Sequence, residues 1–118
     1  MPVVVCQAPA NALDVANHLI LLAAAEPEPE YLSPMRLQKL LYYVQGWSLA
    51  IRDEPMFKER IEAWLYGPVV PEVFRRFRGF RDMSIDPSVI TETPALSDEQ
   101  KEFIAKVWEA YCFGSAQT

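Results

Sequence analysis

Apolar residues near the start of the chain recur every three or four positions, the spacing that places side chains along one stripe of a helix. This pattern predicts a helix over residues 11–25 with Asn11 as its N-cap. The expected buried stripe comprises Val15, Ala16, Leu19, Ile20, Leu22 and Ala23. Pro27 and Pro29 then alternate with glutamates, and because proline cannot continue a helix, a charged loop is expected.

A second helix is predicted over residues 34–51. Ser33 can accept a hydrogen bond from a first-turn amide, and Pro34 suits the first helical position. Its expected buried face comprises Leu37, Leu40, Leu41, Val44 and Ile51, with Trp47 at the flank. Gly46 costs about 1 kcal/mol relative to alanine inside a helix, which indicates either a close helix contact or a local bend.

The apolar pattern changes to a period of two at residues 61–66, which predicts a short strand that Gly67 and Pro68 end. Pro71 then opens a third helix. Its inward residues are expected to be Val73, Phe74, Phe77 and Phe80. β-branched residues around Val89 favour another strand, and we expect it to pair with residues 61–66 in a two-stranded hairpin.

A last helix begins at Ser97 and Gln100, which have the spacing of a capping box, and is expected to end near Gly114. Its apolar face comprises Phe103, Ile104, Val107, Trp108 and Tyr111. The sequence therefore predicts a mainly α domain with a minor β component: four or more helices and a short two-stranded hairpin over residues 11–118, preceded by a tail of residues 1–10.

The composition of the 118-residue chain is typical of a soluble globular domain, with 51% hydrophobic and 23% charged residues. The longest nearly apolar run, residues 18–25, is far shorter than the roughly 20 residues that cross a bilayer, so no membrane span is expected. Cys6 and Cys112 lie far apart without the spacing of a redox motif, so we expect reduced thiols and a cytoplasmic protein.

Few residues suit catalysis or cofactor binding. The chain has a single histidine, His18, whereas a metal site needs a set of ligands and a nucleophile needs a base beside it. Its four glycines form no phosphate-binding loop. We therefore expect no enzyme activity, no catalytic residues, no metal and no cofactor.

The net charge of −5 opposes nonspecific nucleic-acid binding, which depends on Lys and Arg neutralising phosphates. Nucleic acid is therefore not the expected partner. One exception to the acidic balance is a run of four arginines interleaved with phenylalanines: Arg75, Arg76, Arg78 and Arg81. This run is either a solvated helix face, a surface for a protein partner or a nucleic-acid site.

Aromatic residues exceed what a small core needs, and they gather on the second helix and the predicted strand: Tyr42, Tyr43, Trp47, Trp64 and Tyr66. They are either core residues or an exposed strip of the kind enriched at interfaces. Gln38 and Gln45 lie seven residues apart, nearly on one helical face, and are expected to pair with the backbone of the Gly67-Pro68 turn. They either hold that turn or contact a partner.

Two long motifs carry a resemblance to a known family. Residues 37–47, LQKLLYYVQGW, and residues 62–74, EAWLYGPVVPEVF, resemble the Panacea antitoxin domain, which includes SocA-like antitoxins and phage-associated GepA proteins. The likeness extends from about residue 14 to residue 116. It implies a mostly helical bacterial or prophage domain that neutralises a toxin encoded beside it by direct binding. A SocA-like member delivers its toxin to the ClpXP protease, so delivery to an ATP-dependent protease is the alternative.

This resemblance makes positions of the two motifs candidates for binding a cognate protein toxin, with the face from Arg75 to Arg81 as a second candidate surface. The candidates are Gln38, Tyr42, Gln45, Trp64, Tyr66, Gly67, Pro68, Arg75 and Arg78. Phe74 stands where relatives usually carry tyrosine, and relatives continue past the last helix, so residues 11–118 are expected to lack that further segment. An enzyme that reverses a toxin's modification would depend on His18. A transcriptional autoregulator would need a basic recognition helix that the sequence does not offer.

Overall fold

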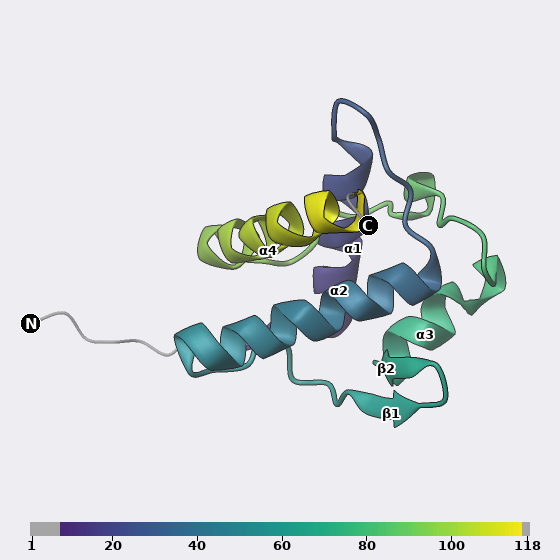
Figure 1. Ribbon diagram of the computed structural model, residues 1–118. Coiled ribbons are helices and arrows are strands. Elements are labelled where there is room, and N and C mark those ends of the chain that lie inside the picture. The colour runs from purple at the N-terminus through teal and green to yellow at the C-terminus, as the bar shows by residue number, and fades with distance from the viewer. Residues whose placement is uncertain (1–7, 117–118) are drawn as a thin grey trace, which may run out of the picture.

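Four helices form the body of the protein, and a small hairpin projects beside them in the computed structural model, which describes residues 8–116 and the side chains up to Tyr111 (Figure 1). The helices are α1 (Ala12–Ala24), α2 (Pro34–Trp47), α3 (Pro71–Phe77) and α4 (Asp98–Ala116). Helices α1, α2 and α4 pack pairwise, and α3 packs on α1 and α2. This mainly α architecture with a minor β component is the class that the sequence predicts. In the described residues, no helix combines the length and apolar character needed to span a membrane.

The apolar core lies between the helices. It contains Val15, Ala16, Leu19, Ile20 and Ala23 of α1, Leu37, Leu40, Leu41 and Val44 of α2, and Ile104, Val107 and Trp108 of α4. Helical spacing predicted all of these positions. Leu22, Phe103 and Tyr111 are only partly buried at its edge.

Helix α1 begins where the sequence predicts, but its cap differs. Asn11 occupies the N-cap position, yet its side chain makes no capping hydrogen bond. Instead the Ala12 amide donates to Oε1 of Glu59 at 2.9 Å. A carboxylate at this end of a helix is favoured by the partial positive charge of the unpaired amides. The prediction that Asn11 caps α1 is therefore wrong, because a residue distant in sequence takes that role.

Helix α2 starts as predicted, since Ser33 Oγ accepts the Arg36 amide at 3.2 Å. Its end differs, because the chain changes to a π-helix over Ser48–Arg52. The i→i+5 bonding of a π-helix rotates later side chains around the axis. Ile51 is consequently 67% exposed, and its predicted burial is wrong. Apart from its chain neighbours and the adjacent helix backbone, no described atom lies within 4 Å of the position that a Cβ of Gly46 would take, so the close contact considered for this glycine is absent in the described residues.

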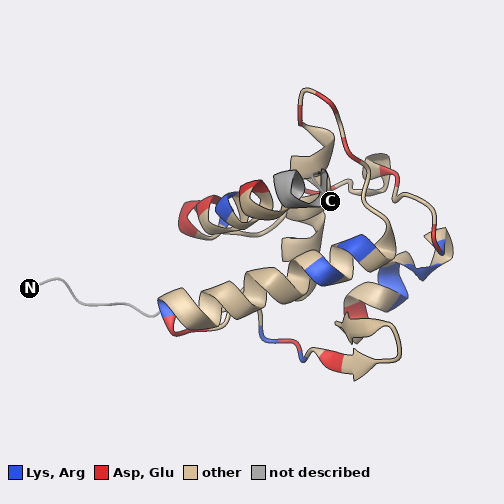
Figure 2. Ribbon diagram, viewed as in Figure 1, with Lys and Arg blue, Asp and Glu red and all other residues tan. Residues whose placement is uncertain are grey.

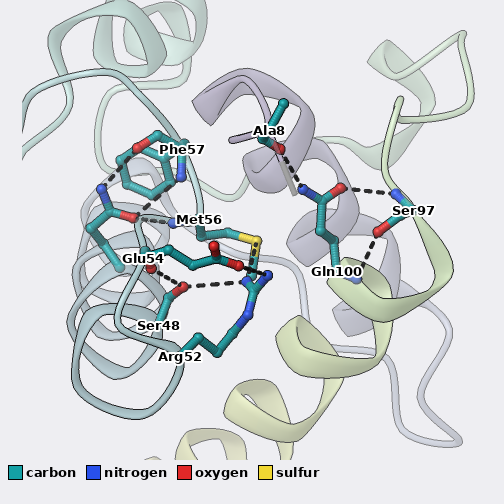
Figure 3. A network of polar contacts seen from close by, with 9 residues as sticks. Ala8, Ser48, Arg52, Glu54, Met56, Phe57, Ser97 and Gln100 are labelled. Carbon is teal, nitrogen blue, oxygen red and sulfur yellow. Dashed lines mark hydrogen bonds and ion pairs between the residues drawn. The ribbon is translucent and has the colours of Figure 1, made fainter. Parts of the chain in front are cut away.

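The π-helix is held by polar contacts with the residues that follow it (Figure 3). Ser48 Oγ donates to the Glu54 carbonyl at 2.7 Å, and an Arg52 guanidinium nitrogen lies 2.8 Å from Oε1 of Glu54. Asp53, with a φ of 57°, ends the helical segment in the left-handed conformation. The chain therefore turns sharply from α2 toward the hairpin.

The hairpin forms between β1 (Glu62–Trp64) and β2 (Gly67–Val69), which run antiparallel with Glu62 opposite Val69. Two predictions are wrong here. Residues Pro87–Val89 form a 3₁₀ turn and not the partner strand. Gly67 and Pro68 lie inside β2 and do not end the first strand. The φ of Gly67, 124°, favours glycine, and proline is tolerated in a short edge strand because its missing amide leaves little of the ladder unpaired.

The remaining elements follow the sequence closely. The capping box of α4 is confirmed: the Gln100 amide donates to Ser97 Oγ at 3.1 Å, and the Ser97 amide donates to Gln100 Oε1 at 2.9 Å. Figure 3 also shows Gln100 Nε2 donating to the Ala8 carbonyl. Cys6 and the side chain of Cys112 lie outside the described residues, so their thiol state stays a prediction.

Candidate functional site

The hairpin, the start of α2 and helix α3 surround a pocket of about 380 Å³, here called the hairpin pocket. Its apolar lining comprises Pro34, Met35, Trp64, Leu65, Tyr66, Pro68, Val69 and Phe74. Leu65 is 88% exposed and Tyr66 is 79% exposed, at the tip of the hairpin. A contiguous apolar surface of this kind usually marks a binding site.

The walls of the hairpin pocket are fixed by specific contacts. The Trp64 ring packs edge-on against Phe74 with 5.0 Å between ring centroids, and its indole Nε1 donates to Glu62 Oε1 at 2.9 Å. At the end of β2, the Val70 amide donates to Oε1 of buried Gln38 at 2.8 Å. These contacts within the chain hold the hairpin against α3 and α2, so the walls of the pocket are formed without a bound partner.

The two glutamines of the first motif have different partners from those predicted. Gln38 bonds Val70, just beyond the Gly67-Pro68 segment. Gln45 does not bond to the hairpin; its Oε1 accepts the amides of Met56 at 2.8 Å and Phe57 at 3.3 Å, and its Nε2 donates to the Phe57 carbonyl at 2.9 Å. The prediction that both amides pair with the Gly67-Pro68 turn is therefore wrong. Both glutamines hold backbone segments against α2.

Two other candidates lie on the opposite side of the hairpin. Tyr42 is 49% exposed and lines a shallow hollow of about 530 Å³ together with Ala63 and Gly67. Trp64 and Pro68 line both this hollow and the hairpin pocket. The structure therefore brings Gln38, Trp64, Tyr66 and Pro68 together at the hairpin pocket and places Tyr42 and Gly67 beside it.

The arginines of the run at residues 75–81 do not all line the same pocket. Figure 2 shows Lys and Arg gathered along α3 and the start of α2, whereas Asp and Glu gather at the start of α4. Arg75 and Arg78 are exposed. Arg75 lines a separate polar hollow with Glu62 and Glu72. The cationic side chains that line the hairpin pocket are Lys39, which the sequence did not indicate, and Arg81, the last arginine of the run considered as a surface for a protein partner.

The backbone at Arg81 has an unusual conformation. Its φ of 56° and ψ of −119°, with the Met83 amide donating to the Phe80 carbonyl at 2.9 Å, are those of the first central position of a type II′ turn. Glycine is favoured there, and another residue costs on the order of 1–3 kcal/mol. Strain of this kind concentrates at functional positions. In the sequence, the arginine run that ends next to Phe80 was the signal for this position.

A second apolar pocket, of about 340 Å³, opens between the end of α2 and α4 and is here called the α2–α4 pocket. Its lining comprises Trp47, Ile51, Phe103, Lys106, Val107, Ala110 and Tyr111. The indole Nε1 of Trp47 donates to the Tyr111 hydroxyl at 2.6 Å, and the Tyr43 ring stacks on Tyr111 with 4.1 Å between centroids. The polar groups of Trp47 and Tyr111 therefore already have a hydrogen-bond partner within the pocket.

The described residues contain no group of three or more His, Cys, Asp or Glu side chains that could hold a metal ion. His18 is half-buried on α1. Burial lowers the pKa of His18 below its ordinary value, and the positive charge of Lys101 lowers this pKa further. Its imidazole is therefore neutral at neutral pH.

Comparisons with known proteins agree with the resemblance seen in the two motifs. Residues 37–117 match the family model described as antitoxin SocA-like, Panacea domain. Antitoxin SocA of Caulobacter vibrioides (strain NA1000 / CB15N) is 43% identical over 67 residues, which cover 57% of this chain. The match covers 35% of the length of that relative. No solved structure matches. The matched range contains the hairpin, α3, α4 and most of α2.

Proposed function

The chain belongs to the SocA-like antitoxin family that carries the Panacea domain, and from this premise we propose that it neutralises a cognate protein toxin by binding it directly. The observation that carries the proposal is the hairpin pocket, which is apolar, exposed and held open by contacts within the protein. In this proposal the chain acts in the cytoplasm by binding and not by catalysis, and it needs no cofactor.

The tip of the hairpin supplies the anchors for the toxin. Leu65 and Tyr66 are almost fully exposed, so a partner that covers them removes a large apolar area from water. Trp64 is already fixed by Phe74 and Glu62, so little side-chain entropy is lost when a partner packs on it. Fixed aromatic side chains surrounded by apolar neighbours are typical of binding hot spots.

The other candidates have supporting roles in this proposal. Gln38 and Gln45 act as positioning residues, because their side-chain amides bond the backbone of Val70 and of residues 56–57. Tyr42 extends the contact surface on the other side of the hairpin. Arg75 and Arg78 are exposed, do not line the hairpin pocket, and contribute charge near it.

Co-expression tests the proposal directly. The chain is produced with the product of the adjacent gene, and growth rescue, affinity pull-down and the mass of the complex are measured. We expect rescue and a stable complex, and we expect Leu65→Ala to weaken the complex about tenfold. Leu49→Ala is the matched control, because Leu49 is also exposed but lies in the π-helix away from the hairpin pocket. Absence of both rescue and complex would refute direct binding.

The α2–α4 pocket favours one alternative, in which the chain also delivers the toxin to an ATP-dependent protease such as ClpXP. An adaptor needs two separate binding surfaces, and this pocket lies at the opposite end of α2 from the hairpin pocket. The half-life of the toxin separates the two mechanisms. A half-life that shortens in the presence of the chain, and lengthens again with Trp47→Ala, supports delivery. An unchanged half-life with lost toxicity supports occlusion.

A further inference from the structure

We infer that the toxin segment that occupies the hairpin pocket combines apolar side chains with at least two carboxylates, which are bound by Lys39 and Arg81. This inference rests on the proposed function and adds to it the chemical class of the bound segment. It also assigns two residues that select that segment: Lys39, which was not predicted from the sequence, and Arg81, which was predicted only as part of the arginine run.

The charge of the hairpin pocket differs from that of the whole chain. The chain carries 16 acidic and 11 basic residues, yet the lining of the pocket contains Lys39 and Arg81 and no Asp or Glu. The net charge of the chain, −5, disfavours the approach of an acidic partner segment. At the hairpin pocket it meets positive charge instead, so acidic residues on the partner favour this docking position over others.

Neither cation has a side-chain partner among the described residues. In the part of the chain that the structure describes, the ion pairs join Arg36 to Glu30, Arg52 to Glu54 and Lys106 to Glu102, and the side chains of Lys39 and Arg81 take part in no ion pair or hydrogen bond. An unpaired cation beside an apolar wall attracts a carboxylate more strongly than one in open water, because the bound partner excludes solvent and lowers the effective dielectric constant.

The turn that carries Arg81 supports the same inference independently. Glycine adopts the backbone angles of this position with less strain than arginine does. The stability of the turn therefore does not account for an arginine here. The turn instead holds the start of a long cationic side chain at the mouth of the pocket. A planar guanidinium can bond a carboxylate through two parallel hydrogen bonds, which makes Arg81 the more selective of the two cations.

A nucleic acid fits the pocket less well than an acidic protein segment. Binding a phosphate backbone depends on a track of cations, whereas this pocket offers two cations around a wall of apolar side chains. The exposed Leu65 side chain matches an apolar residue of a protein far better than a phosphate or sugar. Carboxylates that flank this apolar residue in the partner then form ion pairs with Lys39 and Arg81.

The test uses the full chain and, as the probe, the purified product of the adjacent gene. Affinity is measured by biolayer interferometry at low and high salt. For the wild-type chain we expect Kd to rise about fivefold between roughly 50 and 500 mM NaCl, since salt screens the ion pairs. The double variant Lys39→Glu/Arg81→Glu should bind at least about tenfold more weakly and lose this salt dependence. Lys106→Glu is the control, because it makes one charge reversal of the same kind beside the α2–α4 pocket, and it should bind like the wild type.

Arg81→Gly separates charge recognition from misfolding. It removes the guanidinium and relieves the turn, so the variant should melt at a higher temperature than the wild type while binding the probe more weakly. An array of overlapping 15-residue peptides from the same probe then locates the bound segment. The captured peptides should contain both apolar and acidic residues, and changing their Asp and Glu to Asn and Gln should abolish capture.

The outcomes distinguish the two proposals. If the wild-type chain does not bind the probe, the proposed function fails and this inference falls with it. If the wild-type chain binds, but Lys39→Glu/Arg81→Glu binds as well as Lys106→Glu, direct binding stands and the inference is overturned. Capture of peptides without carboxylates would also overturn it. The inference would also be overturned if the two cations served another partner. In that case the wild-type chain would bind a single-stranded oligonucleotide or a second copy of itself in place of the probe, and the double variant would lose that binding.

Discussion

The hairpin pocket and the α2–α4 pocket are similar in size and both are lined by exposed aromatic side chains, yet their polar groups differ. In the α2–α4 pocket, the Trp47 indole bonds the Tyr111 hydroxyl, and Lys106 lies 3.5 Å from Glu102. In the hairpin pocket, Lys39 and Arg81 have no such partner among the described residues. Exposed apolar area is thus common to both surfaces. Cations without an ion-pair partner among the described residues are what distinguish the hairpin pocket, and they favour a partner of complementary charge.

The difference between the two pockets is tested most sharply by removing one tryptophan from each. Trp64→Ala deletes the ring that lines both sides of the hairpin, so we expect toxin affinity to fall by about 3 kcal/mol, which is more than 100-fold. Trp47→Ala should change toxin affinity less than about threefold. Titration calorimetry with the toxin measures both. Equal losses in the two variants would contradict the distinction between the pockets.

The next largest effect is expected at a residue that supports the fold. Gln45→Ala leaves two backbone amides and a carbonyl of residues 56–57 without their bonds, and we expect the free energy of unfolding to fall by roughly 2–4 kcal/mol. Urea denaturation measures this loss. Toxin affinity of the folded variant should stay near the wild-type value. A stable variant that no longer binds the toxin would instead make Gln45 a contact residue.

A smaller effect is expected at the strained turn of the hairpin pocket. Arg81→Gly should raise the free energy of unfolding by about 1 kcal/mol, because relief of the left-handed backbone outweighs the entropy that glycine loses on folding. Thermal unfolding followed by circular dichroism measures the gain. Arg78→Gly is the control, since Arg78 has ordinary helical backbone angles, and it should lower stability. A lower melting temperature for Arg81→Gly would show that the arginine stabilises the turn.

The smallest effect concerns His18, away from both pockets. Burial and the charge of Lys101 lower its pKa in the folded protein, so the unfolded chain binds the proton more readily. Stability contributed by the neutral imidazole is therefore present above the ordinary pKa of 6.5 and is lost as the pH falls below it. His18→Gln should reduce the loss of stability between about pH 7.5 and 5.5, as measured by urea denaturation at both values. Identical losses in both proteins would contradict the assigned shift.

Local signals in the sequence predicted the parts of the fold that depend on neighbouring residues. The Ser33 cap and the Ser97–Gln100 box are confirmed because each needs only residues within one helical turn. Two local predictions fail where another part of the structure intervenes. Glu59 caps α1 across 47 positions, which no local pattern could indicate. The burial of Ile51 is also wrong, because the π-helix changed the period on which the prediction rested.

The hairpin and its pocket illustrate the same limit. Gly67 and Pro68 have the local signature of a turn, yet the Gln38 side chain holds the end of β2 against α2, and the hairpin turns two residues earlier. Trp64 and Tyr66 were predicted as candidates from the aromatic pattern. Arg81 was predicted only as part of the arginine run and not as a residue of this pocket, because it reaches the pocket through the turn that follows α3.

Hydrogen exchange with mass spectrometry, on the chain alone and in its complex with the product of the adjacent gene, tests the central claim most directly. The account predicts that binding slows exchange of backbone amides at residues 62–70 and at the start of α2, and leaves the Ser48–Arg52 segment and residues 103–111 unchanged. Slowed exchange confined to Ser48–Arg52 and residues 103–111, with none at the hairpin, would contradict it.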